Sequence, residues 1–241
     1  MTRRQRIELY CLCWNDARML PHFFRRYDDI VDRYFIMDNG STDGSLEMLA
    51  AHGRVEVTHF DTPGDSFVAE ETRLSEVMWN PARGRADWAL VVDIDEHIYH
   101  PDLRAYLQSC TDKGVTIVEA IGYEMVSDLF PDGDAPLYQQ VELGVRSDKQ
   151  DKLVAFNPDA VEKSNYQPGR HEAYPEGRIV RPDAREVQLL HFKHLGLDYL
   201  ARRSGELRTG LKDGDLEKQW GVQYTWTRRQ IAPDACKSNQ I

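Results

Sequence analysis

Residues 86–97 read Ala-Asp-Trp-Ala-Leu-Val-Val-Asp-Ile-Asp-Glu-His, an apolar run that passes directly into two carboxylates separated by one residue. In an extended chain alternate side chains share a face, so Asp93 and Asp95 point one way while Ile94 points back toward the core. Hard divalent cations prefer carboxylate oxygens and often bind through one or two carboxylates together with substrate phosphates. The stretch therefore predicts a strand that ends at a site for Mg²⁺ or Mn²⁺ and a nucleoside diphosphate. A strand that ends in a solvated acidic turn is the alternative.

Residues 34–45 have a similar design, in which an apolar strand pattern runs into the loop Asp-Asn-Gly-Ser-Thr-Asp-Gly at residues 38–44. Gly40 and Gly44 permit positive φ, and the hydroxyl and carboxylate side chains between them can cap a following helix. In an α/β sheet, loops that lead from a strand into a helix face the crevice at the carboxyl ends of the strands, where ligands bind. We therefore expect this loop and the Asp93 and Asp95 carboxylates to lie at one site.

Strand and helix patterns alternate around these two motifs. Strands are predicted at residues 7–14, 34–37, 55–60, 88–93, 115–126, 135–146 and 152–157, and helices beginning at residue 20, ending at residue 53, and spanning 66–79, 101–110 and 198–211. Residues 128–136 are rich in Asp, Gly and Pro and are expected to form a loop that closes over the site. The alternation predicts an α/β fold with a doubly wound, mostly parallel central sheet flanked by helices.

Composition limits the class of protein. A chain of 241 residues with 41% hydrophobic side chains can bury a full core, and no run approaches the roughly 18 apolar residues of a membrane helix. The basic residues 2–6 are not followed by the apolar region of a signal peptide. Cys11 and Cys13 favour core packing over a zinc site, and Cys110 and Cys236 form no second pair nearby.

Charge is also informative. The net charge of −10 argues against a general nucleic-acid binder, because such proteins carry basic surfaces. Residues 181–230, however, carry ten Lys and Arg against seven Asp and Glu. This segment either faces an anionic ligand or reflects ordinary surface variation.

Three motifs resemble those of the family 2 inverting glycosyltransferases of the GT-A fold. They are Cys13-Trp14-Asn15-Asp16, the loop at residues 38–44, and residues 88–97. Family members carry a D-D/N-x-S-x-D-G loop after the second strand and a D-x-D at the end of the fourth. The chain looks most similar to a bacterial branch with DNxSTDG and DxDEH/F motifs. The resemblance extends over residues 7–125 and is thin beyond them.

The resemblance implies roles for residues of the donor site. Asn15 and Asp16 match positions near the nucleotide base, and Asp38 and Asn39 match positions that contact base and ribose. Asn39 stands where many relatives carry a second Asp, and an amide can donate as well as accept, so the recognised base stays open. For Asp38 the alternative is a turn-forming residue that bonds its own backbone.

The D-x-D match implies that Asp95 binds a divalent cation directly, while Asp93 binds ribose, a metal-bound water or the cation itself. Glu96 and His97 either orient these carboxylates or belong to a solvated turn. If residues 187–194 are extended, His191 and Lys193 share one face, which makes His191 a candidate metal ligand and Lys193 a candidate phosphate contact.

An inverting reaction also needs a base that takes the proton of the acceptor hydroxyl. Glu172 is the first candidate, Asp128 the second and His171 the third, although no spacing rule ties them to the donor site. For each His a structural or surface role is the alternative.

The sequence thus predicts one GT-A domain over residues 1–241, with a donor half at 1–125 and an acceptor and closing half at 126–241. The resemblance implies metal-dependent, inverting transfer of a sugar from a nucleoside-diphosphate donor, with a UDP-sugar as first candidate, to a saccharide or glycolipid hydroxyl. Bacterial surface polysaccharide synthesis, in the cytoplasm or at the inner face of the membrane, is the implied setting. A nucleotidyltransferase and a non-catalytic nucleotide- or carbohydrate-binding module are the alternatives. The nucleotidyltransferase is disfavoured because residues 11–18 contain no glycine for a phosphate loop.

Overall fold

The computed structural model describes residues 3–225, which form a mixed α/β fold around a central, mostly parallel sheet. The sheet has six strands in the order β3-β2-β1-β4-β9-β6. Their bounds are β1 Ile7–Cys13, β2 Arg33–Asp38, β3 Val55–His59, β4 Trp88–Val91, β6 Ile117–Glu119 and β9 Leu153–Phe156. β1 pairs in parallel with β2 and β4, and β2 with β3, whereas β9 is antiparallel to β4 and β6. The predicted fold class is confirmed.

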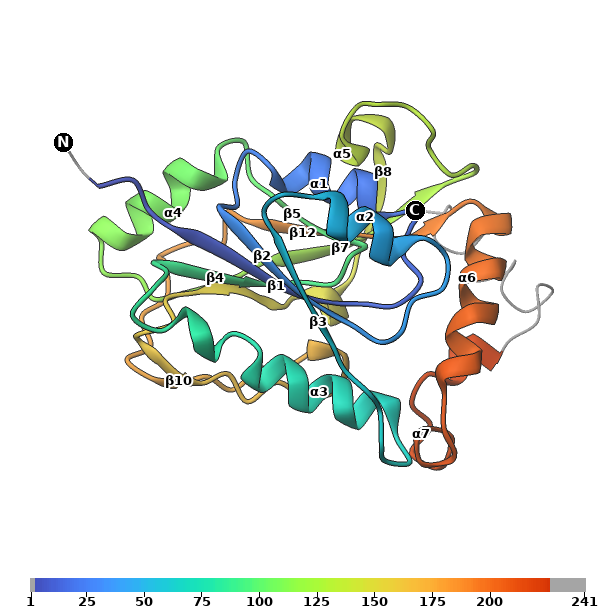
Figure 1. The fold of residues 1–241 in the computed structure, drawn as a ribbon. Helices are drawn as coiled ribbons and strands as arrows, with labels where there is room; N and C mark the ends of the chain where they lie inside the picture. Colours follow the sequence, from blue (N-terminus) through green and yellow to red (C-terminus); the bar gives the residue numbers. More distant parts are fainter. Residues whose placement is uncertain (1–2, 226–241) are drawn as a thin grey trace.

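Helices flank both faces of this sheet. Helices α1, α2 and α4 lie on one side and α3 on the other (Figure 1). The α-helices are α1 Leu20–Tyr27, α2 Ser45–Ala51, α3 Phe67–Val77, α4 Leu103–Asp112, α5 Leu137–Gln140, α6 Leu197–Gly210 and α7 Asp213–Glu217, and the short 3-10 turns are η1 Asn80–Ala82, η2 Asp148–Gln150, η3 Pro168–Arg170 and η4 Val222–Thr225. Among the described residues no helix combines the length and apolarity needed to cross a membrane.

The strands of a second sheet alternate with those of the central sheet along the chain. Its order is β5-β12-β7-β8, with bounds β5 Glu96–Tyr99, β7 Ile121–Ser127, β8 Leu143–Arg146 and β12 Gln188–Leu195. β10 Val161–Lys163 and β11 Glu176–Gly177 form a separate pair. β12 is antiparallel to β5 and parallel to β7, so the carboxyl-terminal third of the chain pairs with residues that directly follow Asp93 and Asp95.

Two predicted strands differ in the structure. Residues 115–126 form two strands, because the chain leaves the central sheet at the buried Ala120, whose N–H donates to Lys152 O at 2.9 Å. Both segments are apolar, so their pattern does not reveal the change of sheet. Residues 135–146 contain α5 before β8, since the Gln140 amide donates to the carbonyls of Gly133 and Ala135 and holds a helical turn.

Apolar side chains fill both sides of the central sheet. One cluster packs beneath α1 and α4, and a smaller one around Trp79 and Phe156 lies on the side of α3.

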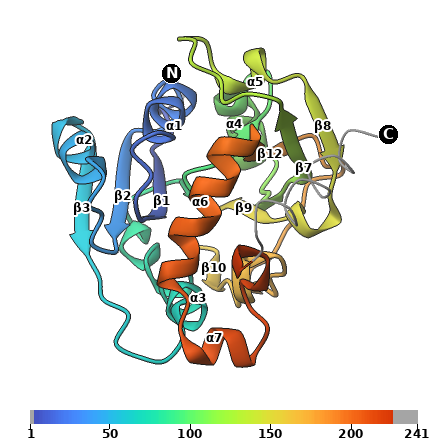
Figure 2. The ribbon, with the colours of Figure 1, turned by 90° about the vertical axis from the view of Figure 1, so that its right-hand side faces the viewer.

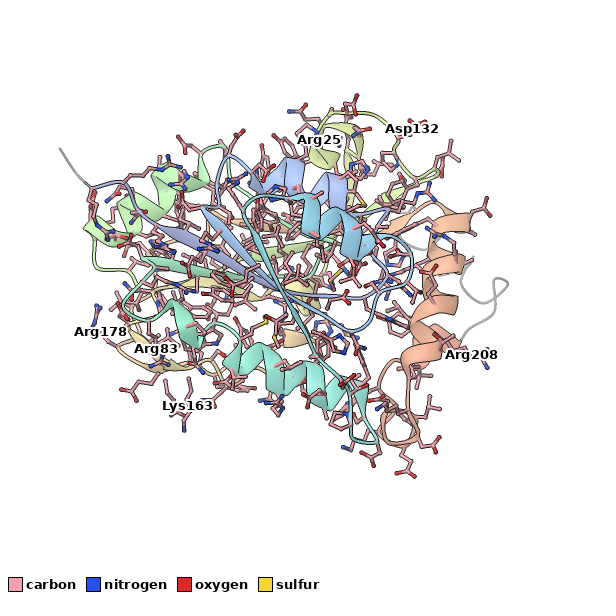
Figure 3. The ribbon with its side chains drawn as sticks, viewed as in Figure 1. Arg25, Arg83, Asp132, Lys163, Arg178 and Arg208 are labelled. Atoms are coloured by element: carbon pink, nitrogen blue, oxygen red, sulfur yellow. The ribbon has the colours of Figure 1, made fainter. Side chains whose placement is uncertain are left out.

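Cys11, Cys13 and Cys110 are free and buried, as core packing predicts. Cys236 lies outside the described residues, and so does the end of the basic segment 181–230. Charged side chains such as Lys163, Arg178 and Arg208 point away from the fold (Figure 3).

Candidate functional site

The carboxyl ends of the parallel strands border a cavity of about 920 Å³. This volume lies within the range of about 300–1,000 Å³ typical of small-molecule sites. Helix α6 stands across this edge of the sheet (Figure 2) and contributes Leu200, Arg203 and Leu207 to the lining. The other titratable side chains of the lining are Asp16, Glu71, Asp93, Asp95, Glu124, Lys149, Lys152, His171, Glu172, His191 and Lys193. Aromatic side chains come from Trp14, Phe60, Phe67, Trp220 and Tyr224.

Asp93 enters the cavity from the loop after β4 and is held by buried charges. The Arg170 guanidinium lies 2.7 Å from Asp93 Oδ1 and 2.8 Å from Glu96 Oε2, and it donates to Val91 O. Lys152 Nζ lies 2.5 Å from Glu96 Oε1 and 4.0 Å from Asp93 Oδ2. Glu96, Arg170 and Lys152 are each at most 3% exposed. Two buried cations therefore compensate two carboxylates.

The backbone of residues 93–96 differs from the predicted strand end. β4 ends at Val91, and Asp93 and Asp95 lie in the turn between β4 and β5 rather than on one face of a strand. The turn forms because the Glu96 N–H donates to Asp93 O and the Glu96 carboxylate accepts the Asp93 N–H, both at 3.0 Å. Burial raises the pKa of Glu96, but Arg170 and Lys152 outweigh it and hold the pKa well below its usual range. Glu96 is thus a charged, buried residue that orients Asp93, and the solvated-turn interpretation is wrong for it.

His97 is fully buried between the rings of Tyr27 and Phe192. Neither ring nitrogen has a hydrogen-bond partner among the described residues, and burial lowers the pKa of His97 to about 3. A neutral imidazole in this position belongs to the core, so His97 lies in neither a solvated turn nor the cavity lining.

Asp95 faces His191 in the lining of the cavity. His191 Nε2 lies 3.4 Å from Asp95 Oδ2, and His191 Nδ1 lies 2.8 Å from Glu124 Oε2. Burial lowers the pKa of His191, but Glu124 and Asp95 outweigh it and raise the pKa well above its usual value. Burial raises the pKa of Glu124, but His191 and Gln150, whose amide donates to Glu124 at 2.8 Å, lower it to about 2. The Asp95–His191–Glu124 row therefore holds one imidazolium between two carboxylates.

Glu124 is a cavity residue that the sequence did not indicate. It lies within β7, and its partner is set by the register of β7 on β12, which places Glu124 directly beside His191. Glu71, Lys152 and Arg203 were missed for a related reason, since no local motif marks them and their positions depend on contacts distant in sequence.

The donor set of this cavity fits a divalent cation that is completed by a substrate. Within residues 3–225 no group of three or more His, Cys, Asp or Glu side chains has the arrangement of a complete metal site. Asp95 Oδ2 and His191 Nε2 nevertheless face the cavity 3.4 Å apart, and a cation bound between them would displace the Nε2 proton of His191 while Nδ1–H stays paired with Glu124. Two ligands bound at about 2.1 Å and near a right angle are about 3 Å apart, and Mg²⁺ often takes its other ligands from water and substrate phosphates. Asp93, in contrast, already faces Arg170 and Lys152.

The loop after β1 is fastened to α6. Arg203 lies 2.6 Å from Asp16 Oδ1 and donates to the carbonyls of Trp14 and Asn15 at 2.8 and 3.0 Å. Burial raises the pKa of Asp16 to about 6, although Arg203 opposes the shift. Asp16 lines the cavity, as expected for a residue of the donor site.

Asn15, Asp38 and Asn39 lie outside the cavity lining, at the end of β2 and in the loops that follow β1 and β2. Asp38 is 1% exposed, and its carboxylate accepts the Ser41 N–H and Oγ–H at 2.9 and 2.5 Å. Asn15 has a φ of 55° and accepts the Thr42 N–H, while the Asn39 N–H donates to the end of β1. The turn-forming role considered for Asp38 is present, and contact of these three residues with base or ribose stays a prediction.

Two of the three residues predicted as the base lie at the cavity. Glu172 and His171 line the cavity, and Asp128 does not. Glu172 is exposed and accepts the Tyr174 hydroxyl at 2.7 Å, while His171 Nδ1 lies 2.6 Å from Lys149 O and has a pKa lowered by burial.

The loop at residues 128–136 likewise contributes nothing to the lining, contrary to its expected role as a cover. Phe130 instead packs against Tyr199 with the Arg18 guanidinium 4.0 Å above its ring. Lys193 does line the cavity, with Nζ 4.8 Å from the Tyr224 ring.

No protein-family model and no curated protein sequence matches the chain. Among solved structures, S. aureus TarS matches with a TM-score of 0.34 at 12% identity, over 53% of this chain and 23% of that chain. Structures of S. aureus TarS 1–349 in complex with UDP and with UDP-GlcNAc match with the same TM-score, identity and share of this chain, over 37% and 36% of those chains. The present chain therefore spans well under half the length of these structures. A similarity of this extent does not identify a family.

Proposed function

We propose that the chain is a nucleotide-sugar-dependent glycosyltransferase of the GT-A type. The observation that supports this most is the pair Asp95 Oδ2 and His191 Nε2, which lie 3.4 Å apart in the lining of a cavity of about 920 Å³ beside the ends of the parallel strands. Two such donors suit a cation that arrives with a diphosphate. The cavity is also large enough for a small-molecule ligand of nucleotide size.

Each group of the cavity has a role in this proposal. Asp95 and His191 would hold Mn²⁺ or Mg²⁺, which stabilises the diphosphate as it leaves the sugar. Lys193 neutralises a phosphate oxygen, since no carboxylate among the described residues pairs with its ammonium group. Asp93, kept in place by Arg170 and Glu96, accepts hydrogen bonds from ribose or from metal-bound water.

The remaining features of the reaction rest on the sequence resemblance. Transfer inverts the anomeric centre, the donor is a UDP-sugar, and the acceptor is a hydroxyl of a saccharide or glycolipid in bacterial surface polysaccharide synthesis. The enzyme works at the cytoplasmic side, where a glycolipid acceptor brings it to the membrane surface. Product NMR after transfer checks the stereochemistry, and a retained configuration contradicts the assignment.

The central test is calorimetry with UDP in the presence and absence of Mn²⁺. The wild type is expected to bind UDP much more tightly with Mn²⁺, and Asp95→Ala is expected to abolish this gain because one of two protein ligands is lost. Asp134→Ala is the matched control, since Asp134 is a fully exposed carboxylate outside the cavity. Equal metal-dependent affinity in Asp95→Ala and wild type contradicts the proposed site. Binding without turnover of any donor identifies a non-catalytic module instead.

A further inference from the structure

Glu71 is a cavity carboxylate on α3 that neither the sequence motifs nor the donor site explains. Helix α3 begins at Phe67, where Ser66 Oγ accepts the Ala69 N–H and caps the first turn. One turn further on, Glu71 lines the same cavity as Asp93 and Asp95 and is half-buried. Its neighbour Glu70 instead forms a bidentate pair with Arg73 on the same helix.

The carboxylates of the cavity differ in how they are engaged. Five of the six that line it accept a hydrogen bond or ion pair from a side chain, namely Asp16, Asp93, Asp95, Glu124 and Glu172. Glu71 has no hydrogen bond and no ion pair with any residue in the described range 3–225. A carboxylate that already accepts from Arg or His⁺ is a weaker proton acceptor, because protonation would break that pair. Glu71 keeps its lone pairs available to a ligand.

We infer that Glu71 is the general base of the proposed transfer, which makes this inference dependent on the proposed function. In the reacting complex a Glu71 oxygen takes the proton of the acceptor hydroxyl. The acceptor oxygen forms a bond to the anomeric carbon, the bond from that carbon to the diphosphate oxygen breaks, and its electron pair leaves with the nucleoside diphosphate. No oxidant or further reactant is needed.

The electrostatic environment agrees with this role. Burial and the nearby Asp93 carboxylate raise the pKa of Glu71 to about 7, although Arg170 and Lys152 oppose the shift. A general base is most effective when its pKa lies near the working pH, because a large fraction is then deprotonated and the group is still a strong proton acceptor. Glu172, in contrast, is exposed, and its carboxylate accepts the Tyr174 hydroxyl.

The test compares Glu71→Gln with Glu70→Gln and Glu172→Gln. Glu70→Gln is a matched control on the same helix, outside the cavity, and Glu172→Gln tests the candidate from the sequence. Affinity for UDP with Mn²⁺ is measured by calorimetry. Release of UDP from UDP-glucose, UDP-galactose and UDP-N-acetylglucosamine is measured with water and with methyl hexosides as acceptors. Thermal unfolding confirms that each variant is folded.

Glu71→Gln is expected to lower turnover by about 10²- to 10⁴-fold, the usual contribution of a positioned base, while leaving UDP affinity within about threefold. Glu70→Gln is expected to keep both values. A folded Glu71→Gln that keeps more than about a third of the wild-type turnover overturns the assignment, as does a loss confined to Glu172→Gln.

The same measurements separate failure of this inference from failure of the proposed function. A wild type that does not bind UDP overturns both. A wild type that binds UDP with Mn²⁺ but turns over none of these donors with either kind of acceptor is a binding protein without a base, which overturns the role of Glu71 and leaves the nucleotide site intact.

Discussion

Arg170 is a buried arginine at a positive φ of 55°, and its guanidinium joins the carboxylates that follow β4. A buried charge pair contributes less to stability than its short distances suggest, because both partners lost their hydration on folding. Removing only one partner is costly, since the other charge stays buried without compensation. Arg170 thus fixes Asp93 at the cavity, and the loss of any single charge from this cluster is expected to destabilise the fold.

Arg170→Met is expected to lower the free energy of unfolding by about 3–5 kcal/mol, because Glu96 loses one of its two cations. Arg181→Met is the control, since the exposed Arg181 pairs with Glu119 at the surface and its loss is worth about 0–1 kcal/mol. Urea unfolding of both variants measures the difference. Equal losses in the two variants contradict the role given to the buried cluster.

The raised pKa of Glu71 also leads us to expect a pH dependence of the free energy of unfolding. Its folded pKa of about 7 lies above the ordinary 4.5, so between these values the folded state binds more protons than the unfolded state and the contribution of Glu71 to stability falls as pH rises. Glu71→Gln removes this effect. Its free energy of unfolding relative to wild type is expected to increase from about pH 4.5 to 7 and to level off above.

The contribution of Glu70 to the free energy of unfolding is expected to depend on pH in the opposite direction. Its hydrogen bonds from Arg73 lower the pKa of Glu70, so its contribution is present above the unfolded pKa and is lost as pH falls through the folded pKa. Chemical unfolding of Glu71→Gln and Glu70→Gln across this pH range separates the two. A flat difference for Glu71→Gln shows that Glu71 ionises as in the unfolded chain.

At the scale of elements, α7 is tied to the start of α3. The buried Asp215 carboxylate accepts the Ser66 hydroxyl at 2.5 Å and the N–H groups of Phe67 and Val68 at 2.9 and 3.1 Å. It also accepts the Lys212 N–H at 3.0 Å in its own turn. Negative charge at a helix N-terminus is favoured by the unpaired N–H groups there. Asp215 therefore holds the α6–α7 segment over the cavity by capping a helix that is distant in sequence.

Asp215→Ala is expected to lower the free energy of unfolding by about 2–3 kcal/mol, because several buried donors lose a charged acceptor. Asp213→Ala is the matched control, since Asp213 is an exposed residue in the first turn of the same helix. Thermal or urea unfolding provides the measurement. A small, equal effect of both changes contradicts the capping role.

At the scale of the whole molecule, the loop after β1 and helix α6, which are distant in sequence, meet at the cavity. Arg203 of α6 reaches Asp16 and the carbonyls of the loop after β1. This contact sets the position of α6 against the central sheet. The loop after β1 and α6, which both contribute to the lining of the cavity, are therefore joined by one guanidinium.

Arg203→Met is expected to lower the free energy of unfolding by about 3 kcal/mol, because the buried Asp16 carboxylate loses its cation. It is also expected to weaken UDP binding with Mn²⁺, since the loop after β1 is no longer fixed. Arg208→Met is the control on the same helix, where the side chain points to solvent (Figure 3). Unfolding and calorimetry measure both effects, and identical behaviour of the two variants contradicts the contact's role.

The sequence alone determined the elements of residues 7–93 and the place of the two acidic loops. Strand patterns, helix caps and glycine-containing turns act over a few residues, so they can be read locally. The loop at residues 38–44 and Asp95 fall at the carboxyl edge of the sheet for this reason, and the local pattern also predicts that the segment carrying His191 is extended.

The tertiary structure alone decided which side chains meet in the cavity. Glu124 reaches His191 across 67 residues, Lys152 reaches Glu96 across 56, and Arg203 reaches Asp16 across 187. Such pairs depend on strand register and on the path of the chain between two sheets, and no local pattern encodes either. Glu71 is a cavity residue for the same reason, because the side of α3 that faces the cavity is fixed by its packing and by the Asp215 cap.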